Sequence, residues 1–186
     1  MPAGAALHEL AATVAAEARA SARPLFDAMR AVEEAVSLGD VLQALTQGVS
    51  REVDRTAVLI ATSGRLRGRQ CAGFADSVSP TSIDLPIDDD GLVGAAVRTK
   101  AMAVSLASAP ETPASAAPAF ARAVGPRDAA AMPIVLGGTV AGVLYCDAPP
   151  EGDGQPAWIT PVGLLVRHAG LVLEAKTARY LTGATG

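Results

Sequence analysis

The stretch Met132–Asp147, MPIVLGGTVAGVLYCD, decides the fold. Two largely apolar runs, residues 128–136 and 139–147, flank the dipeptide Gly137-Gly138. Glycine adopts a positive φ at little cost, and a two-residue connection of this kind forms a tight turn between strands. We therefore predict a β-hairpin near the carboxyl end of the chain.

The second strand of this hairpin contains a glycine, Gly142, which we expect to permit a close backbone approach within the sheet. Successive side chains of a strand point to opposite faces. Alternation therefore pairs Val143 with Tyr145 and Leu144 with Cys146, but it leaves open which pair faces inward.

Other short runs predict further strands. Residues 56–62, TAVLIAT, are rich in β-branched and apolar residues, and the turn SGR separates them from a second run at 66–74. Hairpin pairing of the two is the simplest topology. Pro86 places a third strand, within 82–87, at an edge or a strand end. Residues 101–105, AMAVS, predict one more brief strand.

Helical periodicity appears at both ends of the chain. Leu7, Leu10, Val14 and Ala18 predict a first helix, and a second is expected to start near Pro24. A third helix is predicted within residues 37–53, which begin with the capping pair Ser37 and Asp40, and a fourth within 88–100. A long loop at 106–118 leads to a short helix around Phe120, and a final helix is predicted from 156 to 181. The order of elements predicts an α+β fold, with a central antiparallel β-sheet, helices on its faces, and long N- and C-terminal helices.

Composition excludes several classes of protein. The chain has 186 residues, 50% hydrophobic but only 3% aromatic, so it can bury one domain while offering few rings to a planar ligand. A net charge of -4 with scattered arginines argues against nucleic-acid binding. No run approaches the roughly 20 apolar residues of a membrane span, and no secretory leader is recognisable. We expect a cytoplasmic protein without a membrane span.

Two stretches together resemble the signature of GAF domains. Residues 88–105, DDDGLVGAAVRTKAMAVS, resemble the segment in which a glycine-initiated helix leads through a threonine into a short strand. Residues 131–147, AMPIVLGGTVAGVLYCD, resemble the following segment, with its proline-led strand, glycine turn and second strand with an inner glycine. They occur in the expected order, and the similarity covers roughly residues 37–181. The chain thus resembles a divergent member of the PAS/GAF-like sensory fold.

The resemblance implies a non-enzymatic sensory, signalling or dimerisation module. Where such domains bind a small molecule, they hold it between the sheet and the helix that here lies near residues 89–99. The ligand contacts expected from this placement are Phe74, Leu92, Val93 and Val97, with Ser105 and Tyr145 as polar contacts.

The sequence leaves the cofactor unknown. The sequence lacks the residue set of the cyclic-nucleotide binders, the Cys-His dipeptide of the bilin binders, and a pocket histidine for haem. Many small side chains favour a small apolar or weakly polar ligand, or a pocket filled by the protein itself.

An alternative is a thiol-dependent reductase of the free methionine sulfoxide reductase type, which has the same fold, using Cys71 and Cys146. Alternation would place Arg67, Arg69 and Cys71 on one sheet face, and cationic neighbours activate thiols. The cysteine set of those enzymes is not matched, however, and two buried, reduced thiols are the simpler interpretation.

No metal site is expected. His8 and His168 each lack a second histidine or cysteine at ligand spacing. The aspartates of residues 84–90 lack the alternating ligands and terminal glutamate of a calcium loop, so helix capping explains them.

The domain organisation follows from these elements. We expect an N-terminal helical extension over residues 1–36, a GAF-like domain over 37–181, and a disordered tail at 182–186. Alanine-rich, broadly apolar helices at both ends require a partner surface, which predicts a homodimer built through the terminal helices as a four-helix bundle. The extension also suggests an upstream or partner signalling domain.

Overall fold

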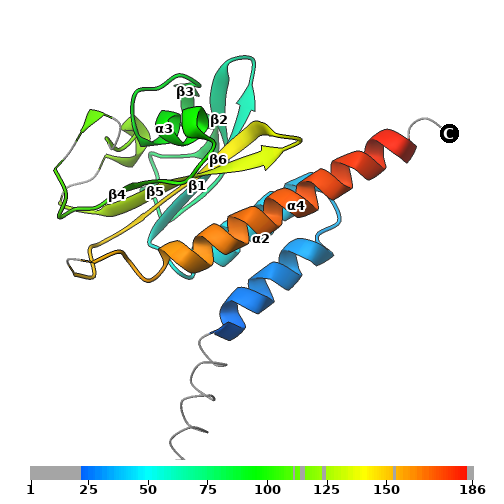
Figure 1. Cartoon of the computed structure of the whole chain (residues 1–186), viewed down its shortest axis with the longest axis horizontal. Helices are drawn as coiled ribbons and strands as arrows, with labels where there is room; N and C mark the ends of the chain where they lie inside the picture. Colours follow the sequence, from blue (N-terminus) through cyan, green and yellow to red (C-terminus); the bar gives the residue numbers. More distant parts are fainter. Residues whose placement is uncertain (1–21, 111, 114–115, 123–124, 153, 184–186) are drawn as a thin grey trace, which may run out of the picture.

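A six-stranded antiparallel sheet forms the centre of the molecule, with strand order β3-β2-β1-β6-β5-β4 and helices on both faces (Figure 1). The computed structural model describes residues 22–110, 112–113, 116–122, 125–152 and 154–183. For residues 181–183 it describes the backbone only. The strands are β1 (Arg55–Thr62), β2 (Arg65–Ala72), β3 (Asp84–Pro86), β4 (Ala103–Ser105), β5 (Asp128–Leu136) and β6 (Thr139–Ala148). The predicted α+β fold is confirmed.

Both predicted hairpins are present. Gly137 and Gly138 have φ angles of 55° and 77° and connect β5 to β6, while the turn at Ser63 and Gly64 connects β1 to β2. Gly142 lies in β6 where a Cβ atom would collide with a backbone carbonyl oxygen of β1, so the expected close approach is confirmed. The proline-containing strand β3 lies at an edge of the sheet, as expected.

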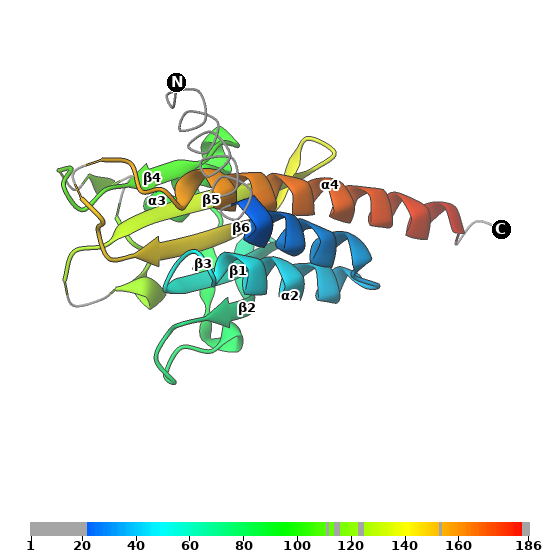
Figure 2. The same ribbon diagram turned by 90° about the horizontal axis from the view of Figure 1, so that it is seen from below.

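Helices α2 (Leu38–Val49) and α4 (Ile159–Gly183) cover one face of the sheet, and the helical residues 22–34 pack on the outer side of these two helices, away from the sheet (Figure 1). We call these three the helix layer. Figure 2, seen from the helix side, shows residues 22–34 lying over the groove between α2 and α4, and α4 running on past the end of the sheet. The predicted first helix, with its stripe from Leu7 to Ala18, lies outside the described residues.

The predicted capping box begins α2. The hydroxyl of Ser37 accepts a hydrogen bond from the backbone N–H of Asp40 at 3.1 Å, and the Asp40 carboxylate accepts one from the backbone N–H of Ser37 at 2.9 Å. These bonds satisfy N–H groups that the first turn of a helix leaves without a partner.

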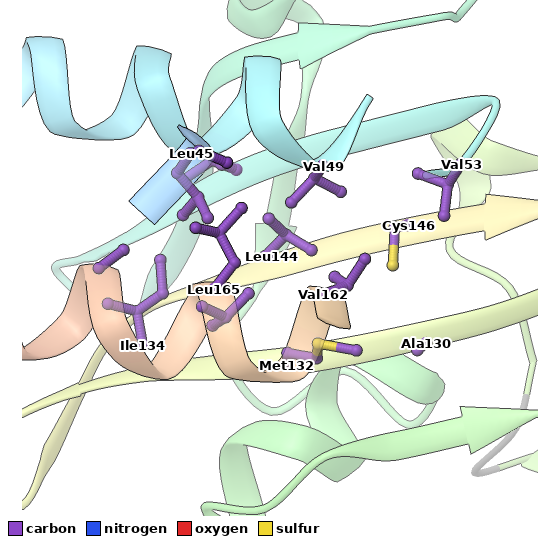
Figure 3. Close-up of a cluster of buried hydrophobic side chains, with 14 of the residues drawn as sticks. Leu45, Val49, Val53, Ala130, Met132, Ile134, Leu144, Cys146, Val162 and Leu165 are labelled. Atoms are coloured by element: carbon purple, nitrogen blue, oxygen red, sulfur yellow. The ribbon is translucent and has the colours of Figure 1, made fainter. Parts of the chain in front are cut away.

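The core beneath the helix layer shows which residues of β6 face each side of the sheet. Leu144 and Cys146 pack there with Met132 of β5, against Leu45 of α2 and Leu165 of α4 (Figure 3). Val143 and Tyr145 therefore face the other side of the sheet.

That second side is covered by α3 (Leu92–Thr99), by the short helices η1 (Pro80–Ser82) and η3 (Ala119–Ala121), and by the loops around them. Leu92 and Val93 of α3 are almost fully buried against Val143 and Tyr145 of β6. The sheet thus has two separate apolar cores, one on each face.

One expectation about β2 is wrong. A bulge opposite Val58 and Leu59 shifts the register of β2, so alternation does not continue through it. Arg67 pairs with Ile60, which packs on the helix-layer core, whereas Cys71 pairs with Ala57 in the core under α3. Arg67 and Cys71 therefore lie on opposite faces of the sheet.

Candidate functional site

A buried carboxylate, Asp147, organises the α3 side of the sheet at the end of β6. Its side chain is 0% exposed and accepts four hydrogen bonds. Oδ1 accepts hydrogen bonds from Nε of Arg55 at 2.8 Å and from Nε of Arg127 at 2.6 Å. Oδ2 accepts them from Nη2 of Arg55 at 2.6 Å and from the hydroxyl of Tyr145 at 2.7 Å. We call these four residues the Asp147 network.

The sheet register builds this network. Arg55 and Asp147 are directly paired between β1 and β6, and Tyr145 lies two residues before Asp147 on the same face. Arg127 reaches the carboxylate from the end of the loop that precedes β5. A buried carboxylate requires cationic or hydrogen-bonding partners, and here both of its oxygens are fully engaged.

An aromatic cluster packs around Arg55. Its guanidinium carbon lies 5.1 Å from the ring centroid of Phe74, and Nη2 also donates to the carbonyl oxygen of Ala121 at 2.8 Å. Phe120 stands edge-on to both Phe74 and Tyr145, with centroids 5.7 Å and 5.5 Å apart. The position of Arg55 is therefore fixed from several directions.

Arg127 has a second acidic partner, because its Nη2 donates to Asp54 at 3.0 Å. Partial burial opposes the charge of Arg127, but the hydrogen bonds to Asp54 and Asp147 outweigh it and hold its pKa above the ordinary value. Burial, followed by the negative charge of Asp147, raises the pKa of Tyr145. The phenol thus stays neutral and donates a hydrogen bond to the carboxylate.

A hollow of about 540 Å³ lies beside the network, between the sheet and the segments that connect β4 to β5. We call it the arginine-lined hollow. Asp128 supports its rim, because the carboxylate of this buried residue accepts a hydrogen bond from the backbone N–H of Ala107 at 2.8 Å. The hollow has the size of a small-molecule site. Its lining residues include Arg55, Ser105, Leu106, Arg122, Arg127 and Tyr145.

The structure separates the six residues predicted to contact a ligand. Ser105 and Tyr145 line the arginine-lined hollow, and Phe74 packs next to it on Arg55. The three α3 residues Leu92, Val93 and Val97 belong to the apolar core under α3 and do not line the hollow. The hollow thus lies beside α3 and not beneath it.

Sequence reasoning missed the charged members of the network. Asp147 was visible only as the acidic end of an apolar strand, and Arg55 only as the residue before another strand. A charged residue two positions after a tyrosine in a buried strand was the one available signal. This spacing shows that Tyr145 and Asp147 share a face of the sheet, but it does not show which cation binds the Asp147 carboxylate.

The two thiols do not form a reactive pair. Cys71 faces the α3 side of the sheet and Cys146 the helix layer, so the sheet separates them. Burial raises the pKa of both thiols, whereas a reactive thiol requires a lowered one. The reductase alternative therefore has no support in the structure.

The described parts of the chain hold neither a metal-binding cluster nor a membrane-spanning helix. No group of three or more histidine, cysteine or acidic side chains is placed to hold a metal ion there. None of the helices there combines the length and the apolar character that a bilayer crossing requires.

Comparison with known proteins gives a consistent result. A family model described as "GAF domain" matches residues 37–161. No curated protein matches the sequence significantly.

Among solved structures, the GAF domain of an Acinetobacter phosphoenolpyruvate-protein phosphotransferase matches with a TM-score of 0.67 and 18% identity. The match covers 85% of this chain and 95% of that one. The corresponding domain from Coxiella burnetii matches with a TM-score of 0.68 and 16% identity, over 86% and 95% of the two chains. A methyl-accepting chemotaxis protein fragment matches with a TM-score of 0.64 and 18% identity, over 78% and 94%. At these identities the likeness establishes the fold alone.

Proposed function

The chain belongs to the GAF domain family, and from this premise we propose that it is a non-enzymatic sensory module. In this proposal it binds a small molecule in the arginine-lined hollow and works as a homodimer through its helix layer. The similar domains in a phosphotransferase and a chemotaxis protein support a sensory or regulatory role. Fold alone does not determine function, so the proposal depends on the site.

The Asp147 network is the observation that carries the proposal. It joins the wall of the hollow, at Arg55 and Tyr145, to the paired strands β1 and β6. The opposite faces of these strands pack on the helix layer through Val58 and Leu144. A ligand in the hollow would therefore contact a rigid, charged cluster whose backbone also supports the helices.

Exposed apolar side chains on the helix layer support the dimer. Leu164 and Leu171 of α4 are 48% and 60% exposed and lie seven residues apart, so they share one helix face with the exposed Ala175. Phe26 in the neighbouring helix is 67% exposed. Rows of this kind match the seam along which helices of two subunits pack.

The ligand part of the proposal is tested by native mass spectrometry of the freshly purified chain. We expect a mass above that of the polypeptide, and we expect the extra mass to disappear when a bulky side chain fills the hollow. Ala117→Trp, at an exposed position of the lining, provides that variant, and Ala101→Trp, exposed and outside the lining, is the control. A bound molecule that both variants retain equally would locate binding elsewhere.

The dimer part is tested by light scattering. The chain is expected to be a dimer at tens of micromolar, and Leu171→Glu to shift it to monomer because a charge would be buried at the seam. Thr81→Glu, at an exposed position on the α3 side, is the charge-matched control. A monomer in the unmodified chain would refute this part.

A further inference from the structure

The charge of the arginine-lined hollow is one-sided. Arg55, Arg122 and Arg127 line it, and no aspartate or glutamate does so among the described residues. The other lining groups are a serine, a tyrosine and small or apolar residues. A concave surface lined by one sign of charge concentrates ligands of the opposite sign.

The carboxylates near these arginines lie outside the lining. Asp147 lies behind the lining, fully buried, and its one charge is shared between Arg55 and Arg127. Asp54 engages only Arg127, from a side chain that is 58% exposed. Arg122 is exposed and makes no hydrogen bond or ion pair to any described residue. With the Asp128 carboxylate at the rim, three carboxylates lie near three cations, but of these charged groups only the arginines line the hollow, so the positive groups are the ones that face a ligand.

Unused hydrogen-bond donors remain on these cations. A guanidinium has five N–H donors. Arg55 uses Nε and Nη2 on Asp147, and Arg127 uses Nε on Asp147 and Nη2 on Asp54. Within the described residues, nothing accepts from the Nη1 atom of either side chain. Because both guanidinium groups bond the same carboxylate oxygen, Asp147 holds the two cations side by side.

We propose that the arginine-lined hollow binds the oxyanion of a small metabolite, a carboxylate or a phosphate, through Arg122 and the free edges of Arg55 and Arg127. This inference rests on the proposed function, because it names the chemical class of the ligand at that same site. Arginine matches the planar or tetrahedral oxygens of both groups and binds them with paired N–H donors. The apolar part of the metabolite would lie along Leu106 and the alanines of the lining.

In this proposal the oxyanion binds the two arginines while Asp147 remains bound to them, and it does not displace the Asp147 carboxylate. Displacing the carboxylate would leave it buried without a cation, and an uncompensated buried charge is strongly unfavourable. The network thus acts as a fixed support that positions two arginines for a second anion.

The test is a binding panel on the full chain at constant ionic strength. Carboxylic acids with one to three carboxylates and phosphate monoesters are compared with their neutral amides and alcohols, first by thermal shift and then by calorimetry. We expect oxyanions, and not their neutral counterparts, to raise the melting temperature. The two arms of the panel distinguish a carboxylate ligand from a phosphate ligand.

Two variants of equal charge make the test specific. Arg122→Gln removes a lining cation that supports no other described residue, and should weaken binding of the best oxyanion about tenfold or more. Arg67→Gln, exposed on the other face of the sheet and outside the lining, should leave the affinity within about twofold. Equal effects of the two variants, or equal binding of oxyanions and neutral counterparts, would overturn the inference.

The remaining outcomes separate the two proposals. A neutral molecule that co-purifies and is excluded by Ala117→Trp would overturn the oxyanion assignment while the sensory function stands. Absence of any bound molecule, together with a flat panel, would overturn both.

Discussion

Removing the Asp147 carboxylate is predicted to destabilise the domain severely. In Asp147→Ala, Arg55 and Arg127, whose side chains are only 14% and 21% exposed, lose their shared anion, and the buried Tyr145 hydroxyl loses its acceptor. Removing one partner of a buried ion pair costs about 3–5 kcal/mol. Because both arginines keep some contact with water, we expect a loss near the lower limit, about 3 kcal/mol.

Urea denaturation at neutral pH measures this loss. Domains are stable by about 5–15 kcal/mol, and for a urea slope of about 1–3 kcal/mol/M the midpoint should fall by about 1–3 M with an unchanged slope. Asp88→Asn, which removes an equal charge from an exposed position, should leave the midpoint nearly unchanged. A loss below about 1 kcal/mol in Asp147→Ala, or equal losses in both variants, would refute the view that this carboxylate organises the site.

A double variant distinguishes a charge effect from a packing effect. If Arg127→Ala is added to Asp147→Ala, one of the two stranded cations is removed, so the combined loss should be clearly smaller than the sum of the single losses. Strict additivity would mean that the two residues act independently, and the network as described would then be wrong.

Three further predictions follow from buried groups. Burial and the charge of a neighbouring carboxylate raise the pKa of Tyr145 above its ordinary 10.0, so the unfolded chain releases this proton first as the pH rises. This contribution to stability is therefore fully present below about pH 10 and falls by up to about 1.4 kcal/mol per pH unit above it. In Tyr180→Phe, where Tyr145 is the one tyrosine left, tyrosinate absorbance should appear only with unfolding, and a reversible rise near pH 10 in the folded state would contradict this. Iodoacetamide should modify Cys146 only at the rate of unfolding and half-buried Cys71 more slowly than free cysteine, and rapid modification of both in the folded chain would revive the reductase alternative. Gly142→Ala should cost about 1–3 kcal/mol in thermal unfolding because its methyl group would meet a strand carbonyl, and an unchanged melting temperature would show that β6 can move aside.

Local features of the fold were predictable because their causes lie within a few residues of one another. The β5–β6 hairpin depends on Gly137-Gly138, and the start of α2 depends on Ser37 and Asp40, three positions apart. In both cases the interacting groups are neighbours in sequence, and the chemistry of the turn or cap restricts the backbone to very few conformations.

Features that depend on strand register were not predictable in the same way. The bulge in β2 is set by its pairing with β1, and it reverses the face that simple alternation assigns to Arg67 relative to Cys71. The outer limits of the domain and its tail, predicted at residues 37–181 and 182–186, stay predictions, although α4 itself runs to Gly183.

The charged site was beyond sequence reasoning for a related reason. Asp147 meets Arg55 across 92 positions of sequence and Arg127 across 20, and only the assembled sheet and the loop before β5 bring the three together. The apolar α3 residues Leu92 and Val93 are expected to contact a ligand because GAF domains that bind one hold it near that helix. In this chain they fill the core, and the adjacent polar surface forms the hollow.

Strand β6 gives the two faces of the sheet a mechanical connection. Its odd-numbered residues Tyr145 and Asp147 belong to the network beside the hollow, and its even-numbered residues Leu144 and Cys146 are buried against the helix layer. Close-packed interiors resist small displacements, so a shift of this strand on one face must be accommodated on the other. An anion bound by Arg55 and Arg127, as we propose, would act on Asp147 near the end of this strand, and the helices that we propose form the dimer seam pack on the reverse side of the strand. The coupling requires no moving lid, because alternation along a single strand already places both surfaces on one backbone.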